Sequence, residues 1–162
     1  MVTFWKHVMH VIKDSDIIIE VLDARYIEET KNKEIERVVK EHKKRLLYVI
    51  NKIDLVEKKP FFKGRPSVYI SSKDRLGTTI LKKKILEMSR GEEVVVGVVG
   101  YPNVGKSSLI NALSGKGKAR TSSESGFTKG KQKIRVDAKI VILDTPGVFS
   151  GMEQDIAKFG KT

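Results

Sequence analysis

Hydrophobic residues along the chain alternate between helical spacing and short continuous runs. Phe4, Val8 and Val11 recur at the interval of one helix face. Between Asp16 and Asp23, Ile17-Ile18-Ile19 followed by Val21-Leu22 is typical of a strand buried on both faces. The same alternation continues to residue 143 and predicts an α/β fold in which helices cover a parallel sheet. Further helices are expected at 35–42, 76–88 and 106–113, and further strands at 46–50, 68–70, 94–99, 134–136 and 140–143.

Length and composition fit a single globular domain over residues 1–162, with 40% hydrophobic residues and no cysteine. The absence of cysteine excludes disulfides, thiolate zinc sites and cysteine nucleophiles. His7 and His10 are three positions apart but have no third ligand nearby, so we expect surface residues there and no histidine metal site. No long apolar run is present near the N-terminus, so we expect a soluble, cytoplasmic protein without a membrane span.

A phosphate-binding motif follows the strand predicted at 94–99. Residues 100–107 read Gly-Tyr-Pro-Asn-Val-Gly-Lys-Ser, which is a glycine, four free positions and then Gly-Lys-Ser. Such a loop presents backbone N–H groups to phosphate oxygens at a helix N-terminus, while the lysine bridges the terminal phosphates and the serine binds magnesium. The predicted nucleotide contacts of this loop are Asn103, Val104, Gly105, Lys106, Ser107 and Ser108.

A base-reading motif stands earlier in the chain, where residues 51–54 read Asn-Lys-Ile-Asp. The carboxylate of Asp54 offers two acceptors to adjacent N–H donors of guanine, whereas adenine would leave it unpaired, so GTP is favoured and an ATPase is not. The two residues before Ile53 would brace the loop and stack along the base. Residues 71–73, Ser-Ser-Lys, match a loop that contacts the guanine oxygen, although a polar strand end is the alternative. The predicted base contacts are Asn51, Lys52, Asp54, Ser71, Ser72 and Lys73.

Two more motifs follow the phosphate loop. Residues 144–147 read Asp-Thr-Pro-Gly, in which Asp144 suits a water-mediated hold on magnesium and the N–H of Gly147 can meet the γ-phosphate. Thr128 is the candidate switch threonine that binds magnesium in the GTP state, with a helix-capping threonine as the alternative. The predicted magnesium ligands are Ser107, Thr128 and Asp144, and the predicted catalytic residues are Lys106, Thr128 and Asn103.

The order of these motifs is a cyclic rotation of the usual GTPase order, because the base-reading motif precedes the phosphate loop. Each pattern alone can arise by chance, but one consistent cyclic order excludes coincidence. The chain resembles the YlqF/YawG (RbgA-like) type of circularly permuted ribosome-assembly GTPases, with matching stretches between residues 16 and 147.

This resemblance implies a three-layer, Ras-like P-loop NTPase fold that is circularly permuted. It also implies binding of GDP, GTP and Mg²⁺, slow hydrolysis of GTP, and assistance in maturing a ribosomal subunit, with the large one favoured. Relatives continue into a C-terminal RNA-facing domain, which we do not expect within residues 1–162.

The net charge of the chain indicates which kind of partner it binds. The net charge is +12, with 32 Lys and Arg against 20 Asp and Glu, which favours a polyanionic partner such as ribosomal RNA over a merely solvated surface. Basic residues beside the switch threonine are candidates to meet it, namely Lys116, Lys118, Arg120, Lys129, Lys131 and Lys133.

Val148 stands where Ras-like enzymes have a glutamine that positions the attacking water. Because valine is apolar, hydrolysis needs another polar group at the catalytic site. By the resemblance, Asn103 could supply it by holding K⁺ beside the phosphates; the alternative is an asparagine that only stabilises a turn. The alternative function is a nucleotide-dependent RNA-binding switch with little or no hydrolysis.

Overall fold

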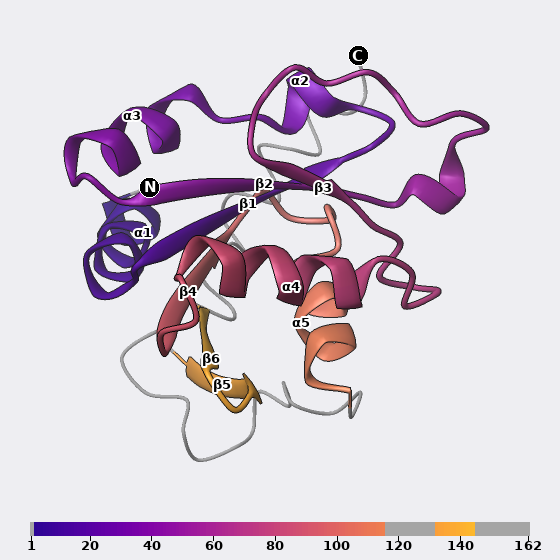
Figure 1. Cartoon of the computed structure of the whole chain (residues 1–162). Helices are drawn as coiled ribbons and strands as arrows, with labels where there is room; N and C mark the ends of the chain where they lie inside the picture. Colours follow the sequence, from indigo (N-terminus) through magenta and orange to yellow (C-terminus); the bar gives the residue numbers. More distant parts are fainter. Residues whose placement is uncertain (1, 116–131, 145–162) are drawn as a thin grey trace.

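The computed structural model describes residues 2–115 and 132–144, which form a six-stranded sheet with helices on both faces (Figure 1). The helices and strands follow in chain order: α1 (Val2–Asp14), β1 (Ile17–Asp23), α2 (Ile27–Thr30), α3 (Lys33–Glu41), β2 (Arg45–Asn51), the 3₁₀ turn η1 (Ile53–Leu55), β3 (Ser67–Tyr69), α4 (Thr78–Met88), β4 (Val94–Val99), α5 (Lys106–Ser114), β5 (Gln132–Asp137) and β6 (Ile140–Asp144). None of the described helices is both long and apolar enough to cross a membrane.

The strand order is β3-β2-β1-β4-β6-β5, which places the strand of the phosphate loop in the interior of the sheet. The first three strands of the chain lie on one side of β4, and the last two lie on the other. All neighbouring pairs are parallel except β5 and β6, which run antiparallel because a short turn joins them. The expectation of a parallel sheet is therefore wrong for β5 alone.

Alternating residues of the strands pack into two hydrophobic layers. On one face, Ile19 of β1 shares a cluster with Leu81 of α4 and Leu109 of α5. On the other face, Ile18 packs in a cluster with α1 and with Val38 of α3. All seven residues of β1 are buried, as its largely apolar sequence predicted, because helices cover the strand from both sides. The α/β class and the three-layer arrangement are confirmed.

Small differences from the predicted elements concern the loops. Helix α4 begins at Thr78, two positions after the predicted start, because Leu76 still pairs with Ser71 through backbone bonds of 2.9 and 3.0 Å. The short helix α2 and the turn η1 were not predicted, since neither is long enough to show a hydrophobic period. The turn η1 contains Asp54 and therefore sets where the base-reading carboxylate lies.

The carboxyl ends of the parallel strands meet at one edge of the sheet, where all described motifs gather. The register of β1 and β2 sets Asp23 directly opposite Asn51, the first residue of the base-reading motif. The phosphate loop starts at Gly100, immediately after β4, and β6 ends at Asp144. The topology thus brings residues from distant parts of the sequence to one place.

Candidate functional site

The phosphate loop enters α5 through backbone conformations that favour glycine and asparagine. Asn103 and Gly105 have φ values of 71° and 93°, in the left-handed region. A Cβ on Gly105 would lie only 2.3 Å from Nδ2 of Asn51, so both conformation and space require glycine there. Gly100 has no such φ; a Cβ there would lie 3.2 Å from the carbonyl oxygen of Val21. Gly100 thus permits close packing of the phosphate loop against β1.

Asn51 ties three loops together from a buried position. Its Nδ2 donates to the carbonyl oxygen of Val104 over 2.9 Å. Its Oδ1 accepts from the backbone N–H of Ser72 over 3.0 Å and from the Ser72 hydroxyl over 2.9 Å. The side-chain amide is therefore used as donor and acceptor at once, which an aspartate or leucine could not imitate. This single residue fixes the base-reading loops against the phosphate loop.

Lys52 and Asp54 extend from the same motif toward the open edge. The ammonium of Lys52 donates to the carbonyl oxygen of Asn103 and lies 3.5 Å from a carboxylate oxygen of Asp23. Its aliphatic stem thus spans from the base-reading motif to the phosphate loop. Asp54 is exposed, and its Oδ1 accepts from the hydroxyl of Ser71 over 2.9 Å. The Ser71 hydroxyl therefore orients the Asp54 carboxylate.

Lys106 and Asp144 form an ion pair between α5 and the end of β6, in which Nζ donates to Oδ1. Asp144 is fully buried, and the lysine side chain is nearly so. Ser107 is exposed at the first turn of α5. A hydroxyl and a carboxylate are hard oxygen donors of the kind that Mg²⁺ prefers, so the residues present fit the predicted metal.

The remaining predicted residues divide between exposed positions and undescribed ones. Ser108 and Lys73 are exposed, on α5 and on the turn after Ser72 respectively. Thr128 and Gly147 lie outside the described residues, as do Val148 and most of the basic cluster of residues 116–133. Within that cluster the structure describes Lys133, which is exposed on β5.

Sequence reasoning missed the role of Asp23 at the end of β1. Arg25 donates to both carboxylate oxygens, from Nε over 3.1 Å and from Nη2 over 2.9 Å, and its backbone N–H donates over 2.9 Å. Burial opposes ionisation, but these bonds and the charge of Lys52 outweigh it and lower the pKa of Asp23. The fixed carboxylate holds the Lys52 ammonium in place. A carboxylate that ends a buried and mostly apolar strand was the available signal.

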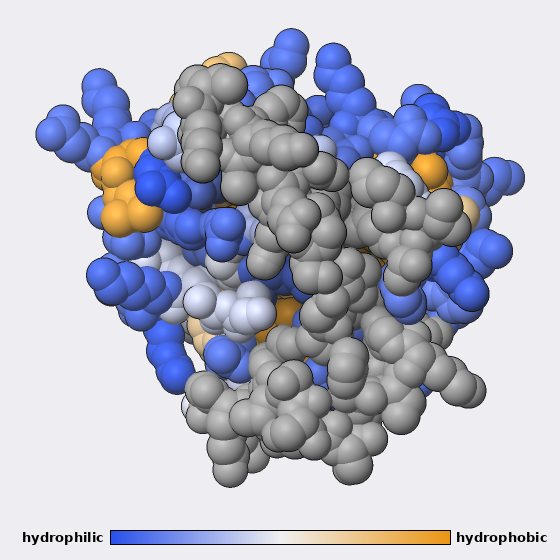
Figure 2. Space-filling view, turned by 180° about the vertical axis from the view of Figure 1, so that it is seen from behind, coloured by the Kyte–Doolittle hydropathy of each residue, from blue (hydrophilic) through white to orange (hydrophobic). Residues whose placement is uncertain are grey.

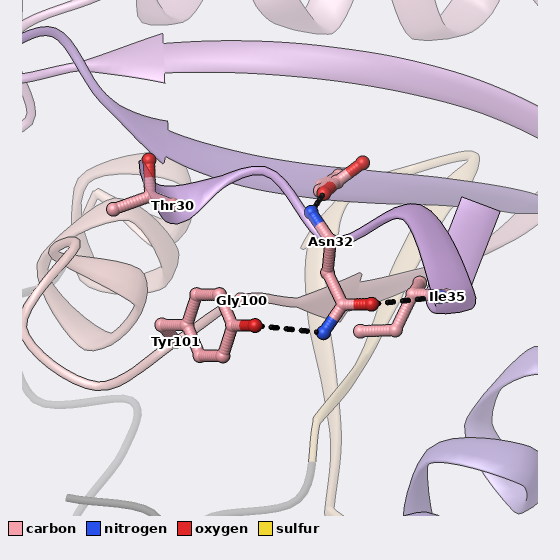
Figure 3. A pocket seen from close by; sticks show the side chains of 6 residues that line it. Thr30, Asn32, Ile35, Gly100 and Tyr101 are labelled. Atoms are coloured by element: carbon pink, nitrogen blue, oxygen red, sulfur yellow. Dashed lines mark hydrogen bonds between the residues drawn. The ribbon is translucent and has the colours of Figure 1, made fainter. Parts of the chain in front are cut away.

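Tyr101 of the phosphate loop was also missed. Its hydroxyl accepts from Nδ2 of Asn32 over 3.0 Å, and Oδ1 of Asn32 caps α3 by accepting from the N–H of Ile35 (Figure 3). The small hollow between these residues is too tight for a water molecule, so it is a packing contact and not a ligand site. No sequence signal joins positions that are 69 residues apart.

A buried carboxyl lies behind this contact. Oε2 of Glu20 accepts from the backbone N–H of Asn32 over 2.7 Å. Burial, and then a hydrogen bond with the side chain of Glu36, raise the pKa of Glu20 to about 9. A proton on Glu20 would let it donate to Glu36, which also pairs with Lys31 at 2.8 Å. The junction of α2 and α3 that contacts the phosphate loop therefore lies against a carboxyl group whose raised pKa favours its protonated form.

Comparisons with known structures agree with this geometry. YjeQ from Thermotoga maritima superposes with a TM-score of 0.61 and 26% identity, over 86% of this chain and 50% of that one. GDP-bound YlqF superposes with a TM-score of 0.55 and 25% identity, over 86% of this chain and 56% of that one. Both are circularly permuted P-loop GTPases. In this chain the strand order likewise places the strand before the base-reading motif, β2, and the strand before the phosphate loop, β4, in one sheet. This chain has the circularly permuted P-loop GTPase fold.

Sequence comparisons add named relatives of this chain. Residues 95–162 match the family described as 50S ribosome-binding GTPase. The GTP-binding protein MJ1464 of Methanocaldococcus jannaschii is 48% identical over 159 residues, covering 93% of this chain and 42% of its own length. The nuclear GTP-binding protein NUG1 of Saccharomyces cerevisiae is 36% identical, covering 85% of this chain and 32% of its own. The chain thus spans less than half the length of these relatives.

These matches confirm the predicted resemblance at the level of circularly permuted GTP-binding proteins. YjeQ and YlqF both superpose on the permuted GTPase fold, so membership of the YlqF/YawG branch stays a prediction.

Proposed function

We propose that this chain binds guanine nucleotides with Mg²⁺ and hydrolyses GTP to GDP and phosphate. The observation that carries the proposal is the Asn51 network, which holds the base-reading loops and the phosphate loop at one sheet edge by bonds of 2.9 to 3.0 Å. The names of two relatives describe them as GTP-binding proteins, which supports the binding of guanine nucleotides. A base and its phosphates could then be bound together by elements that fold as one unit.

Each residue would contribute in a distinct way. The N–H groups around Gly105 would meet phosphate oxygens at the start of α5, and Lys106 would neutralise their charge. Ser107 and Asp144 would hold Mg²⁺, which supplies charge neutralisation on the β- and γ-phosphates when bound. Asp54, oriented by Ser71, would accept two hydrogen bonds from guanine. Thr128 would complete the metal site in the GTP state.

The decisive test of base choice is Asp54→Asn. Replacing an acceptor by a donor should weaken GDP binding and shift preference toward xanthosine diphosphate, whose extra carbonyl accepts from the new amide. Wild-type protein should bind GDP far more tightly than ADP. Titration calorimetry with the three diphosphates measures this, and an unchanged GDP affinity in the variant would remove Asp54 from the site.

We also propose a role in ribosome assembly, more specifically of the large subunit. The family described as 50S ribosome-binding GTPase and the net charge of +12 support this partner. GTP turnover should rise when ribosomal subunits are added, and binding should be tighter with a non-hydrolysable GTP analogue than with GDP. Co-sedimentation at several salt concentrations measures both the state dependence and the phosphate contribution.

A second candidate function is an RNA-binding switch with little or no hydrolysis, which Val148 favours because valine cannot orient water. Single-turnover measurements with saturating subunits separate the two functions. Nucleotide-dependent binding without release of phosphate would establish the switch and exclude the enzyme.

A further inference from the structure

The loop between η1 and β3, residues 56–66, is held at two points. The hydroxyl of Tyr69 donates to the carbonyl oxygen of Pro60 over 2.7 Å. The ring of Phe62 packs edge-on against Tyr48, with ring centroids 5.0 Å apart and planes at 81°. A Cβ on Gly64 would lie 2.4 Å from the Phe62 ring, so the loop closes tightly over it. Side-chain contacts therefore set the path of this loop, whose backbone between η1 and β3 can be followed in Figure 1.

Phe61 lies between these two anchors and projects into solvent. Its side chain is 87% exposed, the highest value among the exposed large hydrophobic residues of the described chain. Because Pro60 and Phe62 are fixed to the body of the protein, the residue between them is displayed. A ring exposed in this way can stack on the flat face of a ligand, and covering it would recover about 1.5–3 kcal/mol of burial free energy.

Basic residues flank Phe61 on both sides in the sequence. Residues 57–65 contain four basic residues and one acidic residue, Glu57, which gives a local net charge of +3. Within the described chain, none of the four takes part in an ion pair. One of them, Lys59, lies with its ammonium 5.4 Å from the ring centroid of Tyr69. All four are exposed: Lys58, Lys59, Lys63 and Arg65.

A displayed aromatic ring flanked by exposed cations fits single-stranded RNA. An unpaired base can stack on the ring, and the cations on either side can meet the flanking phosphates. An apolar protein partner fits less well, because the cores of protein interfaces are depleted of charged residues. On the described surface seen in Figure 2, hydrophobic areas are small and lie apart among hydrophilic residues.

We infer that residues 57–65 form a binding site for single-stranded RNA, in which Phe61 stacks on a base and the four basic residues contact phosphates. This site is separate in sequence from the basic residues near Thr128. It starts three positions after Asp54, so RNA bound there would lie on the base-reading side of the protein. The inference goes beyond the proposed function, since it needs no nucleotide in the GTPase site.

The stacking part is tested with a fluorescein-labelled uridine dodecamer and fluorescence anisotropy. Phe61→Ala should weaken binding at least 5-fold, and Phe61→Trp should retain wild-type affinity, because stacking on an aromatic side chain contributes about 1–3 kcal/mol per base. The matched control is Ile80→Ala, which removes another exposed hydrophobic side chain on α4 and should change nothing. Equal affinity of Phe61→Ala and wild type overturns the site.

The phosphate part is tested by the double variant Lys63→Ala with Arg65→Ala. Loss of two phosphate contacts should reduce the slope of log affinity against log salt by about 1.4. Lys83→Ala, an exposed lysine of α4, is the control and should leave the slope unchanged. An equal slope for the double variant and wild type would contradict the phosphate contacts.

Two further measurements separate this site from its alternatives. Double-stranded RNA should compete poorly, because paired bases cannot stack on Phe61; equal competition would contradict the inference. If Phe61→Ala lost binding to a ribosomal protein while keeping affinity for the dodecamer, the loop would be a protein-docking site instead. GDP titration of the same variant should match wild type, so failure of the GTPase proposal and failure of this one remain distinguishable.

Discussion

Asn51 and Val104 are joined by a 2.9 Å hydrogen bond although 53 positions separate them in the chain. The amide of Asn51 belongs to the base-reading motif, and the carbonyl of Val104 belongs to the phosphate loop. In a permuted chain the two motifs lie on strands separated by β1, so the bond also reports that β1, β2 and β4 are in register.

Replacing Asn51 by Asp should loosen the link without changing side-chain size. The carboxylate can still accept from Ser72 but cannot donate to Val104, which leaves a buried carbonyl unpaired and costs about 1–3 kcal/mol. Urea denaturation should show this loss, and GDP affinity should fall with it. Ser72→Ala is the milder control, because its backbone N–H still donates to Asn51. An Asn51→Asp variant as stable as wild type would contradict the role of the bond.

Gly105→Ala should abolish nucleotide binding and destabilise the fold. The new Cβ would meet Nδ2 of Asn51 at 2.3 Å in addition to suffering an unfavourable φ of 93°. Gly115→Ala is the matched control at the other end of α5, where φ is 75° and nothing lies within 4 Å of the new atom. It should cost only the left-handed penalty of about 1–2 kcal/mol. Similar losses in thermal melts of the two variants would show that crowding at Gly105 is unimportant.

Lys106→Met should eliminate GTP binding and also destabilise the protein, because Asp144 loses its buried cationic partner. Breaking a buried pair from one side costs about 3–5 kcal/mol. The double variant Lys106→Met with Asp144→Asn should regain most of the stability and none of the binding. Denaturation curves and GTP titrations of both variants distinguish a folding defect from a lost phosphate contact. Recovery of binding in the double variant would rule out the proposed role of Lys106.

Potassium dependence tests Asn103. Its φ of 71° already explains an asparagine at this turn, so a role in holding K⁺ needs separate proof. Asn103→Gly keeps the backbone conformation and removes the side-chain oxygen. We expect this variant to bind GDP as wild type does and to lose any faster GTP turnover in potassium than in sodium. Wild-type turnover that is equal in the two salts would dismiss the potassium role and leave Asn103 as a turn residue.

Stability should fall with rising pH because of Glu20. Its pKa is raised from 4.5 to about 9 in the folded protein, so folding takes up a proton between these values. The stabilising contribution is complete below pH 4.5 and is lost as the pH rises through about 9. Glu20→Gln mimics the protonated group and should flatten the fall in Tm between pH 5 and 9. Glu34→Gln on the surface of α3 should leave the slope unchanged; a wild-type slope in Glu20→Gln would refute the assignment.

The sequence by itself determined the α/β class, the positions of the strands and the permuted order of the motifs. These features are local. The largely apolar stretch at 17–22 predicts a strand covered on both sides, and a Gly-Lys-Ser after a strand predicts a phosphate-binding turn. Even the boundaries of β4 at Val94–Val99 follow from six consecutive residues. Because each motif follows a strand, the motifs then predicted that the carboxyl ends of these strands lie together at one edge of the sheet.

Only the tertiary structure decided which other side chains hold the residues of those motifs in place. Asp23 became the anchor of Lys52 because the register of β1 and β2 sets it opposite Asn51, and a shift of one residue would have turned it to the other face. Tyr101 contacts Asn32 because α3 starts beside the phosphate loop. Phe61 is exposed because its two neighbours in the loop are held inward, by contacts with Tyr48 and Tyr69. Such contacts depend on distances across the sheet, which hydrophobic period and short motifs do not encode.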